Sequence, residues 1–430
     1  MNAIHVHGGK PLHGEVKVQG SKNAALPILA ATILIKGTCI IKNCPHISDV
    51  ECMIKLLRCV GCTVLWDGND IVVDAISLRE NRLPREYVTG MRSSVMMMGA
   101  LLGRSKEVSL DYPGGCIIGE RPIDIHIEAL ECMGARIERK ENGLTAGAQS
   151  LKGCPIKLRF PSVGATENVI LAAVTAQGVT ILDNCAKEPE IISLCRFLQK
   201  AGAKISGIGS RRLIIEGIKE LNPVIYTVEA DRIVAGTYLL SVMAAGGKAC
   251  LTHVPVEYME CVMQTAQLMG GDIQVDGNLL TVIREGKLKP LPYLKTEVYP
   301  GFPTDLQSVL LVALSLADGE SLVKETIFNN RFRMAQELNR MGSDITVCGQ
   351  DANIRGNRTL IGRSVVAEDL RGGAALILAG ICAQGDTFVN NYQYIERGYE
   401  DICRDFRLLG ADVRRRCEET EIASKKEETE

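Results

Sequence analysis

One cysteine of this 430-residue chain lies in a segment whose residue types predict a surface loop. Pro113, Gly114 and Gly115 precede Cys116, and such a run favours a turn over a helix or strand. Arg121 follows shortly afterwards. A thiol near a cation and free backbone amides is a candidate nucleophile or proton donor. The alternative is an incidental loop cysteine.

Two segments place a serine and a glycine where an apolar helix is predicted to begin. In the first, Gly20 and Ser21 precede Lys22 and Asn23, and the second is residues 160–168, FPSVGATEN. Free backbone N–H groups at a helix start attract anions, and Lys22 adds a full positive charge. Because serine is also a common N-cap, ordinary helix capping explains either segment taken alone.

An aspartate lies at the predicted entrance of another apolar helix. The segment GFPTD ends at Asp305, whose carboxylate could accept a proton in catalysis or simply cap the helix. Three arginines occur in short polar or glycine-containing turns: Arg331 in FNNRF, Arg371 in DLRGG and Arg397 in IERGYE. The arginine fork suits carboxylate and phosphate groups, although each of the three could equally form a surface ion pair.

The overall charge excludes a generally basic surface. Lys and Arg number 49 against 51 Asp and Glu, so any cationic cluster is local and suits a small anionic substrate better than a nucleic acid. The longest apolar run, residues 24–35, is shorter than the ~20 residues of a membrane span. The pair Cys59 and Cys62 has no second pair and no histidine at ligand spacing, so we expect no metal site there.

The cysteines and the chain ends favour a cytoplasmic protein. Sixteen cysteines are spread along the chain, and the first residues show no basic segment followed by an apolar stretch. We therefore expect reduced, mostly buried thiols. Residues 418–430 are mostly charged or polar and predict a frayed tail.

A short phrase recurs six times and indicates the elements that position these residues. It reads apolar, three variable residues, glycine, small, polar, apolar, as in LRCVGCTV at residues 57–64. An amphipathic helix is predicted to end at a glycine in the left-handed region, and a strand follows. The glycines recur at intervals of 73, 68, 68, 72 and 68 residues: Gly61, Gly134, Gly202, Gly270, Gly342 and Gly410.

Each interval predicts helix, strand, helix, strand, which is typical of the α/β class. Apolar helices followed by a glycine and a strand, as in residues 172–181 and 380–389, support this pattern. Six units of about 70 residues exceed what one core usually serves, so we expect two similar three-unit domains facing each other across a cleft. The alternative is a loose echo of common helix–turn–strand sequences.

The motifs together resemble the enolpyruvyl transferases that act on UDP-N-acetylglucosamine. In chain order they are SKNAALP, MRSS, YPGGCIIGERPIDIHI, SVGATEN, ADRIVAGTY, GFPTD, ETIFNNRF, DLRGG and IERGYE. The match extends from about residue 3 to residue 415, and the PGGC loop is its most specific part. The resemblance implies an α/β fold of two inside-out, barrel-like domains, each of three repeated units, with an active-site cleft between them. It assigns residues 1–21 and 230–430 to one domain and residues 22–229 to the other.

The resemblance also implies an activity in peptidoglycan synthesis, and hence in cell shape and division. The enolpyruvyl group of phosphoenolpyruvate is transferred to the 3-hydroxyl of UDP-N-acetylglucosamine with release of phosphate, without metal, organic cofactor, nucleic acid or membrane. Cys116 adds to or protonates phosphoenolpyruvate, Asp305 faces the sugar hydroxyl, and Lys22 and Arg397 complete the catalytic group. Phosphoenolpyruvate is bound by Lys22, Asn23, Arg121 and Arg397. The UDP-sugar is bound by Asn23, Arg92, Arg121, Pro122, Ile123, Asp124, Ile125, Ser162, Val163, Gly164, Asp305 and Ile327. Supporting polar positions are Arg331, Asp369 and Arg371.

Two alternatives share parts of this resemblance. The shikimate-pathway enolpyruvyl transferase has the same fold, but the PGGC loop and the SVGATEN helix start favour the UDP-sugar enzyme. A regulatory paralogue that binds UDP-sugar without turnover is the second, and the presence of Cys116, Lys22, Asp305 and Arg397 argues against it. One small departure is Ser48, where some members of the family have lysine.

Overall fold

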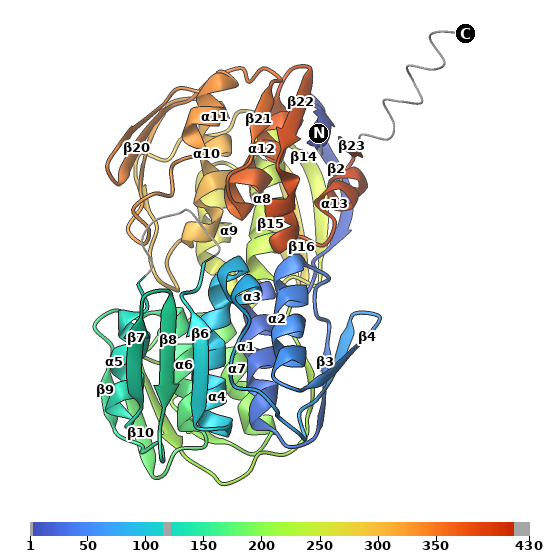
Figure 1. Cartoon of the computed structure of the whole chain (residues 1–430). Helices are drawn as coiled ribbons and strands as arrows, with labels where there is room; N and C mark the ends of the chain where they lie inside the picture. Colours follow the sequence, from blue (N-terminus) through green and yellow to red (C-terminus); the bar gives the residue numbers. More distant parts are fainter. Residues whose placement is uncertain (1–2, 115–121, 417–430) are drawn as a thin grey trace. The chain divides into compact units, whose positions relative to one another are not determined.

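The computed structural model describes residues 3–114 and 122–416, which form two compact units (Figure 1). The first unit contains the described residues from 20 to 229, and the second contains residues 3–19 and 230–416. Each has its own hydrophobic core of aliphatic side chains. Cys116, Arg121 and the predicted tail lie outside the described residues.

Three small sheets form in each unit, one for each repeat of the glycine phrase. The first repeat contains β3 (Thr38–Lys42), α2 (Ser48–Cys59), β4 (Thr63–Asp67) and β5 (Asp70–Asp74). The next two repeats contain β6 (Glu107–Asp111), α5 (Asp124–Cys132), β7 (Arg136–Lys140), β8 (Gly143–Gly147), β10 (Val179–Asp183), α7 (Pro189–Lys200), β11 (Lys204–Ser206) and β12 (Arg212–Glu216).

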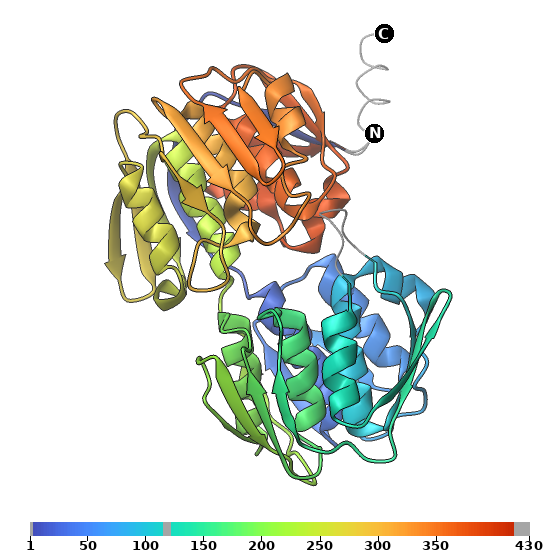
Figure 2. The same ribbon diagram turned by 90° about the vertical axis from the view of Figure 1, so that its left-hand side faces the viewer.

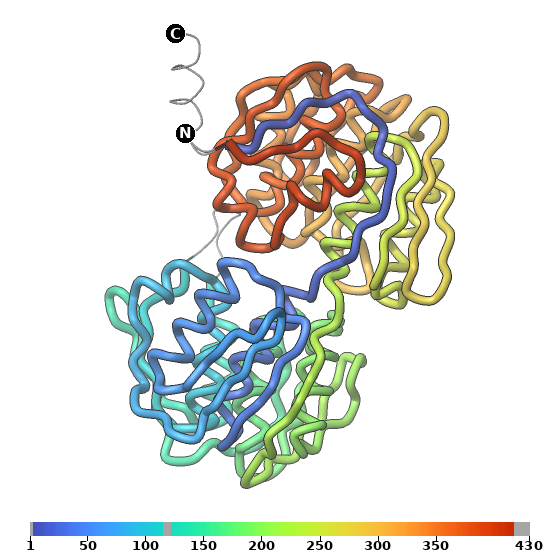
Figure 3. The backbone as a smooth tube through the Cα atoms, turned by 90° about the vertical axis from the view of Figure 1, so that its right-hand side faces the viewer, coloured from blue at the N-terminus to red at the C-terminus, as the bar shows by residue number. Residues whose placement is uncertain are grey.

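The second unit repeats this order of strand, helix and antiparallel strand pair. Its first two repeats contain β14 (Gly247–Thr252), α9 (Glu260–Leu268), β15 (Asp272–Asp276), β16 (Leu279–Arg284), β18 (Glu320–Lys324), α11 (Ala335–Arg340), β19 (Ile345–Cys348) and β20 (Asp351–Arg355). The last repeat contains β22 (Asp386–Asn390), α13 (Ile402–Leu408) and β23 (Asp412–Arg416). Its missing strand is β1 (Ala3–His7), which pairs antiparallel with both β22 and β23 (Figure 3).

A parallel strand completes five of the six sheets. In the first unit these strands are β9 (Pro155–Lys157), beside β10, and β13 (Ile225–Thr227), beside β3. In the second unit they are β2 (Leu12–Lys17), β17 (Leu294–Lys295) and β21 (Ser364–Val366). Because β2 and β13 come from outside the repeat that they complete, the sheets tie together segments far apart in the sequence.

All six glycines of the recurring phrase have positive φ, between 83° and 106°. In every copy the residue after the glycine donates its N–H to a carbonyl five residues earlier, as Ala203 does to Leu198 at 2.9 Å. This is the hydrogen bond of a Schellman C-cap, so the predicted helix ends are confirmed. The prediction of one strand after each helix missed the second strand of each hairpin. Gly68, Gly277 and Gly349 turn three of these hairpins, with φ of 59°, 58° and 60°.

The remaining long helices are buried on nearly all sides, and Figure 2 shows the helices gathered between the sheets of each unit. They are α1 (Lys22–Ala31), α4 (Met96–Arg104) and α6 (Val163–Ala173) in the first unit, and α8 (Arg232–Ala245), α10 (Gln307–Leu316) and α12 (Leu370–Cys382) in the second. Small residues permit close packing: a Cβ on Gly99 of α4 would lie 2.4 Å from the backbone oxygen of Asn168 in α6.

These observations confirm the predicted fold class of two α/β units with three repeats each and with helices inside. The six sheets are separate, so the described residues form no closed barrel. Short helical segments lie before or between the repeats: η1 (Thr32–Leu34), α3 (Arg85–Gly90), η2 (Arg92–Val95) and η4 (Thr304–Leu306). Two others, η3 (Val256–Tyr258) and η5 (Tyr392–Arg397), lie within repeats, between the first strand and the helix that follows it.

Candidate active site

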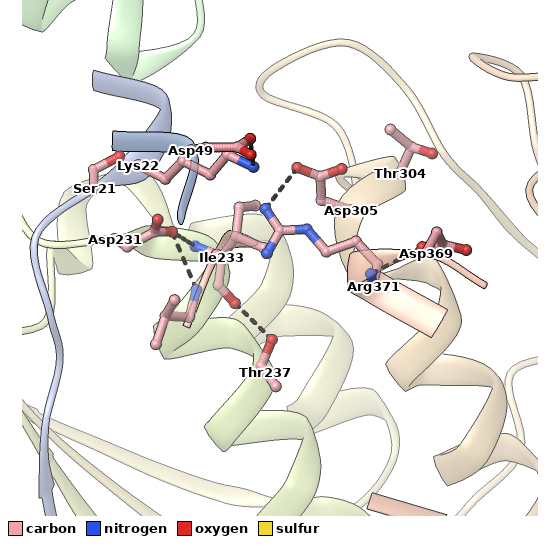
Figure 4. Close-up of polar contacts among 12 residues, drawn as sticks. Ser21, Lys22, Asp49, Asp231, Ile233, Thr237, Thr304, Asp305, Asp369 and Arg371 are labelled. Carbon is pink, nitrogen blue, oxygen red and sulfur yellow. Dashed lines mark hydrogen bonds and ion pairs between the residues drawn. The ribbon is translucent and has the colours of Figure 1, made fainter. Parts of the chain in front are cut away.

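In the second unit two buried arginines hold Asp305. Arg331 donates from Nη2 to Oδ1 at 3.0 Å. Arg371 donates from Nη2 to Oδ2 at 3.1 Å (Figure 4). Both arginine side chains are at most 5% exposed, whereas that of Asp305 is 28% exposed. The helical turn η4 begins at Thr304, so Asp305 is not at the N-cap position. The arginines are therefore not surface residues, and they hold an ionised carboxylate that remains accessible.

Asp369 fixes the position of Arg371 through the backbone. It is the N-cap of α12, and its Oδ1 accepts the N–H of Arg371 at 2.9 Å and that of Gly372 at 3.0 Å. Burial disfavours the charged form of Arg371, but Asp305, Tyr399 and Asp231 outweigh it and raise the pKa of Arg371 above its ordinary value. Arg371 is therefore a permanent cation in this site.

Buried Glu325 connects the Asp305 turn to the segment that carries Ile327 and Arg331. Its Oε2 accepts a hydrogen bond from the Thr304 hydroxyl at 3.0 Å, and its Oε1 accepts one from the backbone N–H of Ile327 at 2.8 Å. The guanidinium of Arg331 also lies over the ring of Phe328, 5.9 Å from its centre. The predicted residues Asp305, Ile327 and Arg331 thus belong to one connected structure.

In the first unit Lys22 forms a buried ion pair. Its Nζ is 2.7 Å from Oδ2 of Asp49, and both side chains are nearly inaccessible (Figure 4). Lys22 is the first residue of α1, whose N-cap Ser21 accepts the N–H of Ala24 at 3.3 Å. Asn23 follows in the same turn and is partly exposed. A cation at a helix start beside free N–H groups can bind an anion.

The second serine segment lies at the start of α6, as predicted. Ser162 is the N-cap and accepts the N–H of Ala165 at 3.3 Å. A Cβ on Gly164 would lie 3.0 Å from the His126 ring, so that helix turn packs against α5. Nδ1 of His126 is 2.7 Å from Nδ2 of Asn168, which also donates to the backbone oxygen of Val95 at 3.1 Å. Val163 is partly buried beside them.

Predicted UDP-sugar positions meet around residues 122–125. Arg92 donates from Nη2 to the backbone oxygen of Pro122 at 3.3 Å. Asp124 is hydrogen-bonded to Arg159; partial burial raises the pKa of Asp124, but this bond lowers it below its ordinary value overall. Ile123 is buried and Ile125 half-buried. Arg397 ends η5 in the second unit.

Sequence reasoning gave no role to four buried residues that the structure places beside these positions. Asp49 pairs with Lys22, Glu325 holds two segments together, Glu167 lies in α6, and Tyr399 lies next to Arg371. Glu325, Glu167 and Tyr399 occur within the motifs ETIFNNRF, SVGATEN and IERGYE, which was the available signal. Asp49 had no such signal.

The described residues contain neither a cluster of metal ligands nor a helix that could span a membrane. No three His, Cys, Asp or Glu side chains among the described residues come together as metal ligands do. No helix in residues 3–114 or 122–416 combines the length and the apolar character of a membrane span.

Known proteins match nearly the whole chain. Residues 6–406 match the family described as EPSP synthase (3-phosphoshikimate 1-carboxyvinyltransferase). The UDP-N-acetylglucosamine 1-carboxyvinyltransferase 2 of Caldanaerobacter subterraneus subsp. tengcongensis is 44% identical over 413 residues, which is 96% of this chain and 99% of that protein. The UDP-N-acetylglucosamine 1-carboxyvinyltransferase of Cellvibrio japonicus is 43% identical over 417 residues, with the same coverage of both chains.

Solved structures share the fold. The enolpyruvyl transferase NikO from Streptomyces tendae superposes with a TM-score of 0.88 at 24% identity, over 96% of this chain and 98% of that one. An EPSP synthase from Acinetobacter baumannii gives 0.75 at 17% identity, over 97% and 100%. These likenesses concern the fold alone. The sequence matches show that the chain belongs to the EPSP synthase family of carboxyvinyl transferases, together with the UDP-N-acetylglucosamine 1-carboxyvinyltransferases.

Proposed function

We propose that this protein transfers the enolpyruvyl group of phosphoenolpyruvate to the 3-hydroxyl of UDP-N-acetylglucosamine and releases phosphate. The observation that carries the proposal is identity of 40–44% to relatives named for this activity over nearly their whole length. Such a reaction belongs to peptidoglycan synthesis in the cytoplasm, and so contributes to cell shape and division. We assign residues 1–21 and 230–430 to one domain and residues 22–229 to the other.

The charged residues suit the substrates. Phosphoenolpyruvate is a small polyanion, and Lys22, Arg121 and Arg397 are proposed to bind its phosphate and carboxylate. Lys22 begins a helix and pairs with the carboxylate of Asp49, which an anion can replace or share. Asn23 is proposed to lie beside both substrates. The UDP-sugar contacts are proposed for Arg92, residues 121–125, residues 162–164, Asp305 and Ile327.

The proposed reaction proceeds by addition and elimination. Cys116 supplies a proton to C3 of phosphoenolpyruvate, which makes C2 electrophilic. The sugar 3-hydroxyl forms a bond to C2 while its proton passes to Asp305, giving a tetrahedral phospholactoyl intermediate. A proton then passes from C3 to the Cys116 thiolate left by the first step, the C2–O bond to phosphate breaks, and the enol ether and phosphate are released.

Asp305 is suited to receive the hydroxyl proton. Its two oxygens face Arg331 and Arg371, so the carboxylate is kept ionised and its direction is fixed. The alternative of a regulatory protein without turnover is not favoured, because the relatives are named for the enzyme. Arg331, Asp369 and Arg371 remain supporting residues in this proposal.

Phosphate release with both substrates tests the function. We expect turnover only when phosphoenolpyruvate and UDP-N-acetylglucosamine are both present. Each substrate alone is one control, and shikimate 3-phosphate in place of the UDP-sugar is a second, because relatives in the family use that acceptor. Turnover with shikimate 3-phosphate alone as acceptor, or no turnover at all, would refute the proposal.

Labelling tests the role of Cys116. An electrophilic phosphonate such as fosfomycin should attach to Cys116 before any other thiol, faster with UDP-N-acetylglucosamine present. Burial raises the pKa of many competing thiols, to about 12 for Cys62 and Cys195, which keeps them protonated. Exposed Cys132 and Cys348 are the internal controls. Peptide mapping that finds the first label on either would overturn the assignment, and Cys116→Ser should escape labelling and lose most activity.

A further inference from the structure

A buried pair of hydroxyl groups lies next to the guanidinium of Arg371. Oγ1 of Thr237 is 2.8 Å from the phenol oxygen of Tyr399, and neither residue is more than 1% exposed. Cζ of Arg371 is 6.0 Å from the centre of the Tyr399 ring. Thr237 belongs to α8 and Tyr399 follows η5, so segments 162 residues apart meet at this arginine.

Counting protons fixes the direction of these hydrogen bonds. The Thr237 hydroxyl has one proton, which it donates to the backbone oxygen of Ile233 at 2.9 Å (Figure 4). Tyr399 must therefore donate to Thr237, and the lone pairs of its oxygen remain available to a cation. Burial raises the pKa of Tyr399 more than Arg371 lowers it, so the phenol stays neutral. Tyr399 thus presents a fixed dipole to Arg371.

Arg371 needs such support. Only Nη2 of its guanidinium donates to Asp305, while Nη1 is buried and has no hydrogen-bond acceptor among the described residues. The contact with Asp305 involves one nitrogen only, so the orientation of the guanidinium plane also depends on the groups around it, of which Tyr399 is one. Asp369 fixes the backbone of Arg371 but not this rotation.

We propose that Tyr399 and Thr237 are positioning residues: they orient Arg371, which orients Asp305 for proton transfer. The inference rests on the proposed function, in which Asp305 accepts the proton of the sugar hydroxyl. Proton transfer depends on geometry, and a small displacement of the accepting group reduces the rate far more than substrate affinity. The signature of the proposal is therefore a change in kcat with little change in KM.

The chain offers a matched control in the next residue of α8. Tyr238 is also fully buried, and its hydroxyl donates to Asp405 at 2.6 Å, which Arg404 also holds at 2.9 Å. Tyr399→Phe and Tyr238→Phe each remove one buried hydroxyl and the hydrogen bond that it donates. We expect Tyr399→Phe to lower kcat about tenfold with each KM within about twofold, and Tyr238→Phe to destabilise the fold similarly with kcat unchanged.

Thr237 gives a second, independent test. Thr237→Val keeps the shape but removes the hydroxyl that Tyr399 needs, and should lower kcat as Tyr399→Phe does. Thr237→Ser keeps the hydroxyl and should restore most of the rate. The double variant Tyr399→Phe/Thr237→Val should be no slower than either single variant, because both break the same chain of contacts.

The wild-type protein is assayed first for phosphate release, which separates the two proposals. Absence of wild-type turnover refutes the function itself. Given wild-type turnover, equal kcat losses in Tyr399→Phe and Tyr238→Phe would overturn the positioning role, as would an unchanged kcat in Tyr399→Phe. If Tyr399→Phe does not fold, the Thr237→Val and Thr237→Ser pair decides: similar rates in the two variants refute the proposal, and a rate restored only by serine supports it.

Discussion

Asp305 and Glu167 are two carboxylates beside buried helices, and their surroundings are opposite. Asp305 accepts hydrogen bonds from the guanidinium groups of two arginines. Glu167 lies inside α6 at 1% exposure, its Oε2 has no hydrogen-bond partner among the described residues, and its charged neighbours are Glu190 and Glu188. Burial, and then these two carboxylates, raise the pKa of Glu167 well above its ordinary value.

The residues around a carboxylate, and not its own residue type, therefore decide whether it can act as a base. Asp305 accepts hydrogen bonds from two guanidinium cations, and opposite charges at this distance favour the charged form of a carboxylate. At Glu167, burial and the nearby carboxylates of Glu190 and Glu188 favour the neutral acid. The first is suited to accept a proton, and the second to hold one. The same change, from carboxylate to amide, should therefore have different effects at the two sites.

The largest effect is expected for Asp305→Asn. The amide keeps the size of the side chain but cannot accept the hydroxyl proton, so turnover should fall by about 10³-fold or more. Binding of UDP-N-acetylglucosamine, measured by calorimetry, should change little. We prefer asparagine to alanine because alanine would leave two buried arginines without any acceptor. Glu167→Gln is the matched control, and equal losses of turnover in the two variants would remove the distinction between them.

Removing one of the two cations that contact Asp305 should weaken the support for its negative charge and so bring its surroundings closer to those of Glu167. Arg331→Met takes away the partner of Oδ1 and also the contact of Nε with the backbone oxygen of Thr304. We expect a loss of about 2–3 kcal/mol in the free energy of unfolding, measured by denaturant titration, and about a tenfold or greater loss in kcat. A variant with wild-type stability and rate would show that one arginine suffices.

A smaller, pH-dependent effect is expected for Glu167→Gln. The folded protein retains a proton on Glu167 that the unfolded chain releases near pH 4.3, so wild-type stability due to this group is complete below that pH. It is lost as the pH rises from there through the raised pKa of the folded state. Glutamine has no such proton, so the variant should gain about 1–2 kcal/mol relative to wild type between pH 5 and 8.

Denaturant titrations of both proteins at several pH values measure this difference. Other carboxylates titrate equally in both and cancel. A stability difference that is flat from pH 5 to 8 would show that Glu167 is charged in the folded protein, and would remove the contrast with Asp305.

The smallest effect is expected for a carboxylate–arginine pair at the surface. Arg159 pairs with Asp124 and with Glu128 but is 51% exposed, so water replaces much of what Arg159→Gln removes. We expect less than about 1 kcal/mol in unfolding free energy, and a loss that disappears in high salt. A loss as large as that of Arg331→Met would mean that burial does not explain the strength of the Asp305 contacts.

Local sequence was sufficient for much of the fold. The six glycines marked helix ends because only a residue without Cβ enters the left-handed region at little cost, and all six have positive φ. Apolar residues on every side of α10 and α12 required burial. The second strand of each hairpin was missed because strands of about five residues give little periodicity.

The sequence was also sufficient to predict four site residues, because charged side chains at helix starts and in short turns are available for chemistry. They are Lys22, Asp305, Arg331 and Arg371. The sequence left open whether Asp305 was an N-cap and whether the arginines were surface residues. Each question concerns contacts between segments, such as the 3.1 Å bond between Asp305 and Arg371, which are 66 residues apart. Spacing along the chain carries no information on such a distance.

The repeat, the helix ends and the types of residue available for chemistry could be predicted without a structure, because they follow from backbone sterics and side-chain chemistry over a few neighbouring residues. The tertiary structure was needed to show which carboxylate has arginine partners, which arginines are buried, and that Tyr399 and Thr237 meet beside Arg371. Ionisation and hydrogen bonding depend on desolvation and on charges within a few ångströms. Folding alone brings those charges together.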